Sequence, residues 1–116
     1  MAENIMDSAL VLEKAVRESD EFTQLKARYQ QLYADDSARQ MFDNFRNVQM
    51  KLEEKRMMGE PIPDDEVQYA QQLVAVIQQN EKIVALMEAE QRMSMVIGEI
   101  NKVVMKPLEE LYNNMK

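Results

Sequence analysis

Apolar residues recur three and four positions apart along almost the whole chain, a spacing that places them on one face of an α-helix. Residues that end helices are rare: the chain has two glycines and three prolines, and Gly59, Pro61 and Pro63 fall close together. Helix is therefore predicted from end to end, with one clear loop. A chain of 116 residues fits a single domain, so we expect one all-α helical bundle over residues 1–116.

Capping residues divide this pattern into five predicted helices. Ser19 and Asp20 are typical of a helix end followed by a new start. Ser37 and Gln40 have the spacing of a capping box, in which each side chain accepts from a free backbone N–H. Gly59 is expected to end the third helix in a left-handed conformation. The predicted helices cover residues of about 3–18, 20–34, 37–58, 64–105 and, as a short C-terminal helix, 107–114.

The predicted helix 64–105 carries two apolar seams in different registers. At roughly 100° per residue the second seam is rotated from the first by about a quarter turn, and the polar stretch 78–82 lies at the join. Either one long helix offers different faces to different neighbours, or the chain turns at the polar stretch into a helical hairpin. Gln, Glu and Lys are good helix formers and the stretch has no glycine or proline, which favours the continuous helix.

A continuous helix of this length predicts self-association. It would span roughly 60 Å at 1.5 Å per residue, about twice the width of a small domain, so that much of it would protrude uncovered. An intramolecular bundle could also use both faces. We expect a homo-oligomer, most simply a dimer. Heptad spacing marks the predicted interface, which consists of Leu86, Met93, Val96, Ile100 and Val103.

Two further groups of residues have predicted packing roles. The earlier helices are expected to pack through Tyr29, Leu32, Phe42 and Phe45. Most of the 11 methionines lie in or beside apolar stripes and are predicted to be core or interface. Met57 and Met58 are adjacent and cannot share a helix face, so one of them is predicted to be exposed as a contact site.

The charge balance argues against nucleic acid as a direct partner. With 14 basic and 21 acidic residues, the chain has a formal charge of −7 and repels phosphate backbones at long range. The third predicted helix is the most basic part, and it supports an alternative function as a nucleic-acid-associated protein. Acidic side chains interleave with the basic residues of this helix, which are Arg39, Arg46, Lys51, Lys55 and Arg56.

The chain lacks the side chains that most enzymes use. It has no histidine and no cysteine, which excludes thiolate-bound zinc, iron–sulfur clusters and Glu-x-x-His di-iron sites within this chain. Adjacent carboxylates such as Glu53 and Glu54 point about 100° apart on a helix, so helix caps and solvated faces explain them better than acid–base catalysis. We expect a protein that is not an enzyme, with no catalytic residues, no metal site and no cofactor.

Nothing in the sequence predicts membrane insertion. The opening MAENIMDSALVLEKAV is too acidic and interrupted for a signal peptide. No apolar run approaches the ~20 residues needed to span a bilayer. The expected localisation is cytoplasmic, without a membrane partner.

Two long segments resemble the YlbF/YmcA family of small bacterial helical proteins. The run NEKIVALMEAEQRMSMVIGEINKVVMKPLEELY is similar to the C-terminal half of that family. The run SDEFTQLKARYQQLYADDSARQMFDNFRNVQMKLEEKRMMGEPI resembles its opening, with an F-x-x-F helix and a Gly-centred loop. The resemblance covers nearly the whole chain and is nearest to the YheA-like branch, whose members are mostly uncharacterised.

This resemblance implies an all-helical, oligomerising cytoplasmic protein without catalysis of its own. Family relatives act as accessory factors in competence, sporulation and biofilm formation, in a complex that influences ribonuclease Y and messenger RNA maturation. The implied function is a helical adaptor or regulator whose partners are itself, other YlbF/YmcA-like proteins or ribonuclease Y. Iron–sulfur clusters in that wider complex use cysteine ligands, and this chain departs from them by having none.

Overall fold

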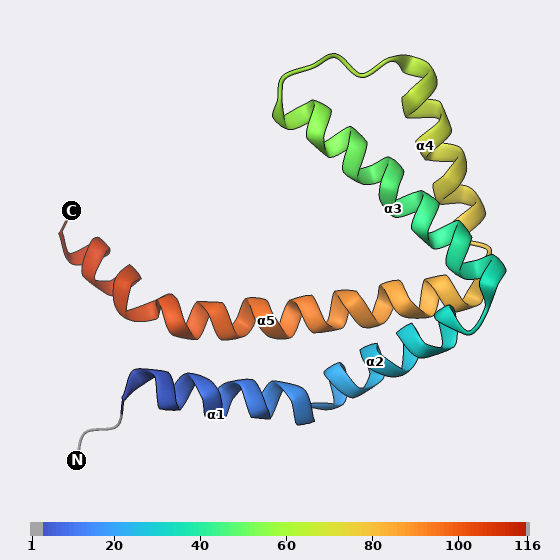
Figure 1. The fold of residues 1–116 in the computed structure, drawn as a ribbon. Helices are drawn as coiled ribbons and strands as arrows, with labels where there is room; N and C mark the ends of the chain where they lie inside the picture. Colours follow the sequence, from blue (N-terminus) through green and yellow to red (C-terminus); the bar gives the residue numbers. More distant parts are fainter. Residues whose placement is uncertain (1–3, 116) are drawn as a thin grey trace. The chain divides into compact units, whose positions relative to one another are not determined.

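The computed structural model describes residues 4–115 of the chain. In this part there are five α-helices and no strand, which confirms the all-α class (Figure 1). In chain order they are α1 (Ile5–Glu18), α2 (Asp20–Tyr33), α3 (Asp36–Met57), α4 (Asp64–Ile77) and α5 (Glu81–Asn114).

The chain divides into two compact units. The core unit, Ala27–Met87, holds α3, α4 and the adjoining parts of α2 and α5. The terminal unit combines Met1–Lys26 with Glu88–Lys116, so that α1 and most of α5 belong together. Within the terminal unit α1 runs antiparallel alongside α5 (Figure 1). The expected single domain over 1–116 stays a prediction.

The predicted junction between the first two helices is confirmed. The hydroxyl of Ser19 donates to the carbonyl of Val16 over 2.7 Å and accepts from the N–H of Phe22 over 3.2 Å. One side chain therefore closes α1 and caps α2. Asn4 caps the start of α1 by accepting from the N–H of Met6, and the expected start at residue 3 lies outside the described residues.

The capping box predicted at the start of α3 is wrong. Asp35 is the N-cap, because its carboxylate accepts from the N–H of Ala38 over 3.1 Å, and α3 therefore begins at Asp36. Aspartate is at least as good an N-cap as serine. Asp35 also forms an ion pair with Lys82, which Ser37 could not make.

The end of α3 follows the expectation for Gly59. Its φ of 71° lies in the left-handed region, where a side chain would be strained. The N–H of Glu60 donates to the carbonyl of Lys55 over 2.9 Å, and the N–H of Gly59 donates to the carbonyl of Arg56 over 3.2 Å. This is the Schellman arrangement, and it satisfies carbonyls that the helix end leaves free.

The continuous helix predicted over 64–105 is wrong, because α4 ends at Ile77 and α5 begins at Glu81. The side-chain oxygen of Asn80 accepts from the N–H groups of Lys82 and Ile83, each over 3.1 Å, and so starts a new helix. Burial explains the break. On one straight helix Ile77 and Leu86 would point about half a turn apart, but both are completely or almost completely buried. The turn lets both face a core, and this gain outweighs the helix propensity of the linking residues.

The separate helix predicted over 107–114 is also wrong, because α5 continues through Pro107 to Asn114. Proline lacks the N–H that would bond to the carbonyl of Val103. Val103 is exposed, so water can satisfy that carbonyl. The missing bond is consistent with the change of direction that α5 shows toward its C-terminal end (Figure 1).

The core unit has a compact apolar interior. Its buried residues come from α2, α3, α4 and the start of α5, and they are Leu32, Ala38, Phe42, Phe45, Ile77, Ile83 and Leu86. The packing predicted for Leu32, Phe42 and Phe45 is therefore confirmed. Tyr29 is half-buried, and its hydroxyl accepts from the guanidinium of Arg46 over 2.9 Å.

Candidate interaction surfaces

The predicted interface residues on α5 do not share one environment. Leu86 is completely buried and Met93 is 8% exposed, whereas Val96 and Ile100 are half-buried and Val103 is 72% exposed. Exposure therefore rises along the seam toward the C-terminus. The chain itself covers the first part of the seam, and the part from Val96 onward is only partly covered. The interface itself stays a prediction.

Helix α1 exposes most of its apolar side chains. None of its residues is buried, and Ile5 is 81% exposed. Met6, Leu10 and Val11 are each more than half exposed. A helix of 14 residues is marginal by itself in water, so most of its stability has to come from packing. An exposed apolar surface of this kind marks an interaction site.

The C-terminal half of α5 has a second apolar face that the sequence analysis missed. Its members recur at helical spacing and are all exposed, and we call Ile97, Val104, Leu108 and Leu111 the terminal stripe. Met105 and Tyr112 lie beside the terminal stripe and are also exposed. The signal was present in the sequence, but the heptad that includes Val103 matches the same segment.

The α3–α4 hairpin of the core unit encloses a cavity of about 520 Å³. At its rim the ammonium of Lys55 lies 2.7 Å from both carboxylate oxygens of Glu66 and links the two helices. Lys51, Glu54, Glu60 and Asp65 complete the charged part of the lining. With two lysines and four carboxylates in its lining, the cavity has an excess of negative charge and does not favour an anionic ligand.

Both methionines at the tip of α3 are exposed, where one was expected to be. Met57 is 80% exposed and Met58 is 75% exposed. They precede Gly59, where the chain leaves the helix. Flexible thioethers suit surfaces that adapt to partners. A contact site at this tip stays a prediction.

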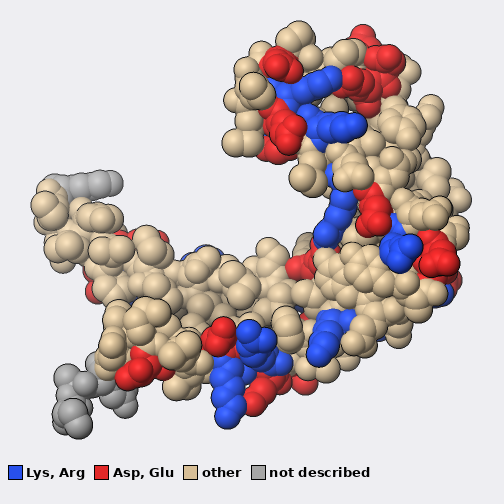
Figure 2. Space-filling view, viewed as in Figure 1, with Lys and Arg blue, Asp and Glu red and all other residues tan. Residues whose placement is uncertain are grey.

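Three of the five basic residues of α3 are compensated locally by carboxylates. Arg39, Lys55 and Arg56 each lie within ion-pair distance of a carboxylate, from Asp36, Glu66 and Glu53 respectively. Figure 2 shows acidic side chains among the basic ones of the hairpin on the visible face, and no continuous basic patch there. Such a surface attracts a phosphate backbone weakly.

The aromatic residues of α3 are not placed to stack on the nucleobases of RNA or DNA. Phe42 and Phe45 are buried, and the guanidinium of Arg46 lies 4.5 Å from the ring centroid of Phe42. The cation therefore interacts with an aromatic face of its own chain. A stacking platform for single-stranded nucleic acid requires exposed rings.

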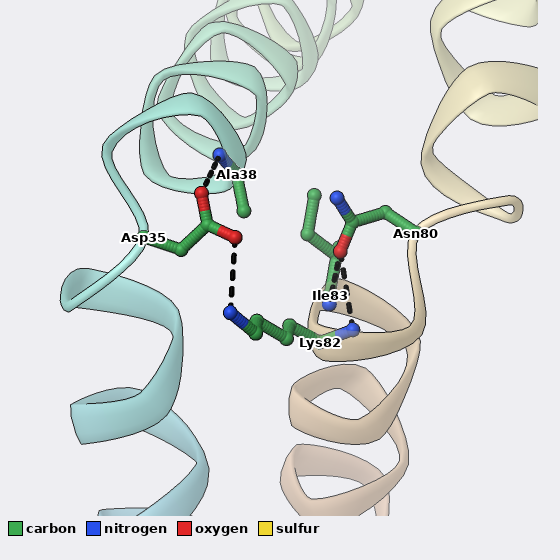
Figure 3. Close-up of polar contacts among 5 residues, drawn as sticks. All are labelled: Asp35, Ala38, Asn80, Lys82 and Ile83. Atoms are coloured by element: carbon green, nitrogen blue, oxygen red, sulfur yellow. Dashed lines mark hydrogen bonds and ion pairs between the residues drawn. The ribbon is translucent and has the colours of Figure 1, made fainter.

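A polar clamp joins the starts of α3 and α5 (Figure 3). Asp35 accepts from the N–H of Ala38 with one carboxylate oxygen and lies 3.0 Å from the ammonium of Lys82 with the other. The N–H of Ala38 and, after it, the ammonium of Lys82 hold the pKa of Asp35 below its usual value. Asn80 caps α5 next to Lys82. The clamp is structural, because each of its groups satisfies a helix end or a neighbouring charge.

Two further findings concern the described residues alone. Across 4–115, no three side chains among Asp, Glu, His and Cys are grouped so that they could hold a metal ion. In the same part of the chain, no helix combines the length and apolar character that crossing a membrane requires.

The fold and its exposed helices define a small all-α protein of the helical-bundle class. Residues 5–109 match the family described as control of competence regulator ComK, YlbF/YmcA. The chain belongs to the YlbF/YmcA family, and the resemblance found in the sequence is confirmed.

The relatives place the chain near the YheA-like branch. A UPF0342 protein of Bacillus velezensis is 59% identical over 114 residues, which is 98% of each chain. The UPF0342 protein YheA of Bacillus subtilis is 58% identical over 116 residues, which is all of this chain and 99% of YheA.

Solved structures agree with the fold. A DUF964 protein from Bacillus stearothermophilus matches 98% of this chain and all of its own with a TM-score of 0.86 at 44% identity. YheA from Bacillus subtilis matches 95% of this chain and all of its own with a TM-score of 0.75 at 52% identity. One chain of the crystal structure of Bacillus subtilis RicA in complex with RicF matches 93% of this chain and 96% of its own with a TM-score of 0.67. Its identity of 16% makes that match a likeness of fold alone.

Proposed function

We propose that this protein is a non-enzymatic helical adaptor or regulator that acts in the cytoplasm through protein contacts. The observation that carries the proposal is the α5 seam, whose exposure rises from 0% at Leu86 to 72% at Val103. A heptad seam that continues beyond the part covered by the rest of the chain suits packing against another helix. The available part of the predicted interface is Val96, Ile100 and Val103.

The partners we propose are a second copy of this chain and other YlbF/YmcA-like proteins, with ribonuclease Y as a further candidate. A chain with this fold occurs in the crystal structure of RicA in complex with RicF. Membership of a family described by competence control supports a regulatory process of this kind. In that process the chain would present helix surfaces, and any chemistry would belong to its partners.

The interface is tested by Ile100→Asp, which places a charge in the half-buried part of the seam. We expect the oligomer to dissociate or the fold to weaken, because a carboxylate is costly to bury without a partner. Light scattering measures the mass and circular dichroism measures the melting curve. An unchanged mass together with an unchanged melting curve would refute the seam as an interface.

The partners are tested by capture of the tagged chain from its native cytosol after nuclease treatment, with mass spectrometry of the bound proteins. Recovery of YlbF/YmcA-like proteins or ribonuclease Y supports the proposal. If only the chain itself is recovered as an oligomer, this protein shares the fold of the family but does not act in the same pathway.

The nucleic-acid alternative is disfavoured by the ion pairs of Arg39, Lys55 and Arg56. A salt titration separates the two functions, since binding to phosphates weakens steeply as salt is added. We expect no salt-dependent binding of RNA by the purified chain.

A further inference from the structure

We propose that the cavity of the α3–α4 hairpin binds an aliphatic polyamine, a flexible chain whose ammonium groups are separated by methylene groups. Its volume of about 520 Å³ falls in the range of small-molecule sites. Its lining comes from α3, from the loop after α3 and from α4, all within the core unit. The site uses no residue of the α5 seam, so it goes beyond the proposed function and can fail separately from it.

The apolar part of the lining suits the methylene groups of such a ligand. At 100° per residue the lining positions of α3 fall within an arc of roughly 160°, so α3 turns one face to the cavity. Tyr69 of α4 adds an aromatic ring, a side chain that attracts ammonium groups. Its hydroxyl accepts from the side-chain amide of Asn44 over 3.2 Å, which ties it to α3. The apolar and aromatic members of the lining are Val48, Leu52, Met58 and Tyr69.

The charged part of the lining favours a cation. Lys55 and Glu66 offset each other, because the ammonium lies 2.7 Å from both carboxylate oxygens. Lys51 is then the one remaining base, and it faces three remaining carboxylates, so the lining keeps an excess of two negative charges. Within residues 4–115 these three carboxylates take part in no ion pair, and they belong to Glu54, Glu60 and Asp65.

Glu54 is the carboxylate that a bound cation would stabilise most. It lies in the last turn of α3, where the helix dipole is negative and a carboxylate is disfavoured. Asp65 lies in the first turn of α4, where the dipole is positive, and its carboxylate accepts from the N–H of Glu66 over 3.0 Å. Part of its charge is therefore already compensated. We expect Glu54 to contribute more to the binding of a cation than Asp65 does.

The spread of the carboxylates selects an extended cation over a metal ion. Among the residues that the structure describes, no three acidic side chains are grouped closely enough to hold a metal ion. Glu54 belongs to α3, Glu60 to the loop and Asp65 to α4. A compact ion cannot reach all three, whereas ammonium groups on a carbon chain can meet separate carboxylates. The methylene groups between them then contact the apolar side chains of the lining.

The affinity test is a calorimetric titration of spermidine into the full chain at a fixed ionic strength of about 0.15 M. We expect saturable binding of one spermidine per chain. Glu54→Gln and Asp65→Asn are each expected to weaken it about twofold to fivefold, with the larger effect at Glu54. Asp43→Asn is the matched control, because it removes the same charge from an α3 position outside the lining and should leave the affinity nearly unchanged. All three side chains are exposed, so the variants are expected to fold, which circular dichroism checks.

The location is tested by the methyl NMR signals of two adjacent methionines. Met58 lines the cavity and Met57 does not, although both are exposed, at 75% and 80%. Spermidine should shift the methyl signal of Met58, with the same midpoint as the calorimetric titration, and should leave the signal of Met57 nearly unchanged. Met57→Leu and Met58→Leu assign the two signals.

Four results would overturn the inference. The first is the absence of saturable binding. The second is equal weakening by all three charge variants, which would mean diffuse attraction to an acidic chain. The third is binding that leaves the Met58 signal unchanged, which would place the ligand elsewhere. The fourth is the same saturable shift of Met58 with MgCl₂ at equal ionic strength, which would mean a metal site. Because none of these results depends on the oligomeric state, the proposed function is tested separately.

Discussion

The core unit and the terminal unit differ in how they use their apolar residues. The core unit buries seven residues, among them Phe42 and Leu86. In the described part of the terminal unit only Ala89 and Met93 are buried, although α1 and the end of α5 are rich in large apolar side chains. The same helical pattern therefore has two outcomes. One region completes a core within the chain, and the other leaves most of its large apolar side chains exposed.

The largest effect is expected from Phe42→Ala, which removes a buried side chain from the core unit. Loss of this buried ring should lower the free energy of unfolding by about 3–5 kcal/mol, because a cavity replaces a packed side chain. Denaturant titration measures the loss. Met50→Ala on the same helix is the control: its side chain is 60% exposed, and a change within about 0.5 kcal/mol is expected. Equal losses would contradict the core assignment.

The next largest effect concerns α1, which no core supports. Raising the protein concentration through the dimerisation range should slow amide exchange in α1 by about tenfold or more, because a partner would cover its apolar face. Mass spectrometry of exchanged fragments measures this. Amides of α3 should show no such dependence. Concentration-independent exchange in α1 would remove the contrast between the two units.

The contribution of Asn80 to the break between α4 and α5 is tested by Asn80→Ala. Loss of the oxygen that accepts from Lys82 and Ile83 should cost about 1 kcal/mol of unfolding free energy. Asn80→Asp keeps an acceptor in the same position and serves as the control. If alanine proves neutral in a denaturant titration, burial alone maintains the break.

The smallest effect is expected at Asp35 and depends on pH. Because folding lowers the pKa of Asp35 from 3.8, its charge stabilises the fold above that pH, and the contribution is lost as the pH falls through the lower folded-state value. Asp35→Asn keeps the cap but not the charge. The stability difference between wild type and this variant should be constant from neutral pH to about pH 5 and shrink in acid. A difference that grows in acid would contradict the clamp.

The sequence predicted the elements well where a local signal sufficed. Ser19 and Gly59 mark real helix ends, since a hydroxyl cap and a left-handed glycine act within one turn of chain. Aromatic residues at helical spacing correctly indicated the core positions Phe42 and Phe45. The cap at Asn80 is also a local signal, but its neighbours have high helix propensity, which predicts a continuous helix.

The candidate surface was harder to predict, because periodicity says which residues share a face and not what covers that face. Leu86 and Val103 belong to one heptad seam, yet one is completely buried and the other is 72% exposed. The terminal stripe at Val104 and Leu108 was missed for the same reason. A sequence cannot rank two apolar faces of one helix until the covered positions are known.

The sequence by itself determined that this protein is all-α, where α1 and α3 end, and to which family it belongs, because caps, breakers and order along the chain are local properties. Tertiary structure decided between the continuous helix and the turn that the sequence left open at 78–82, and it decided that α5 continues through Pro107. Both depend on burial: Ile77 and Leu86 gain a core by the break, and the carbonyl of exposed Val103 can bond to water.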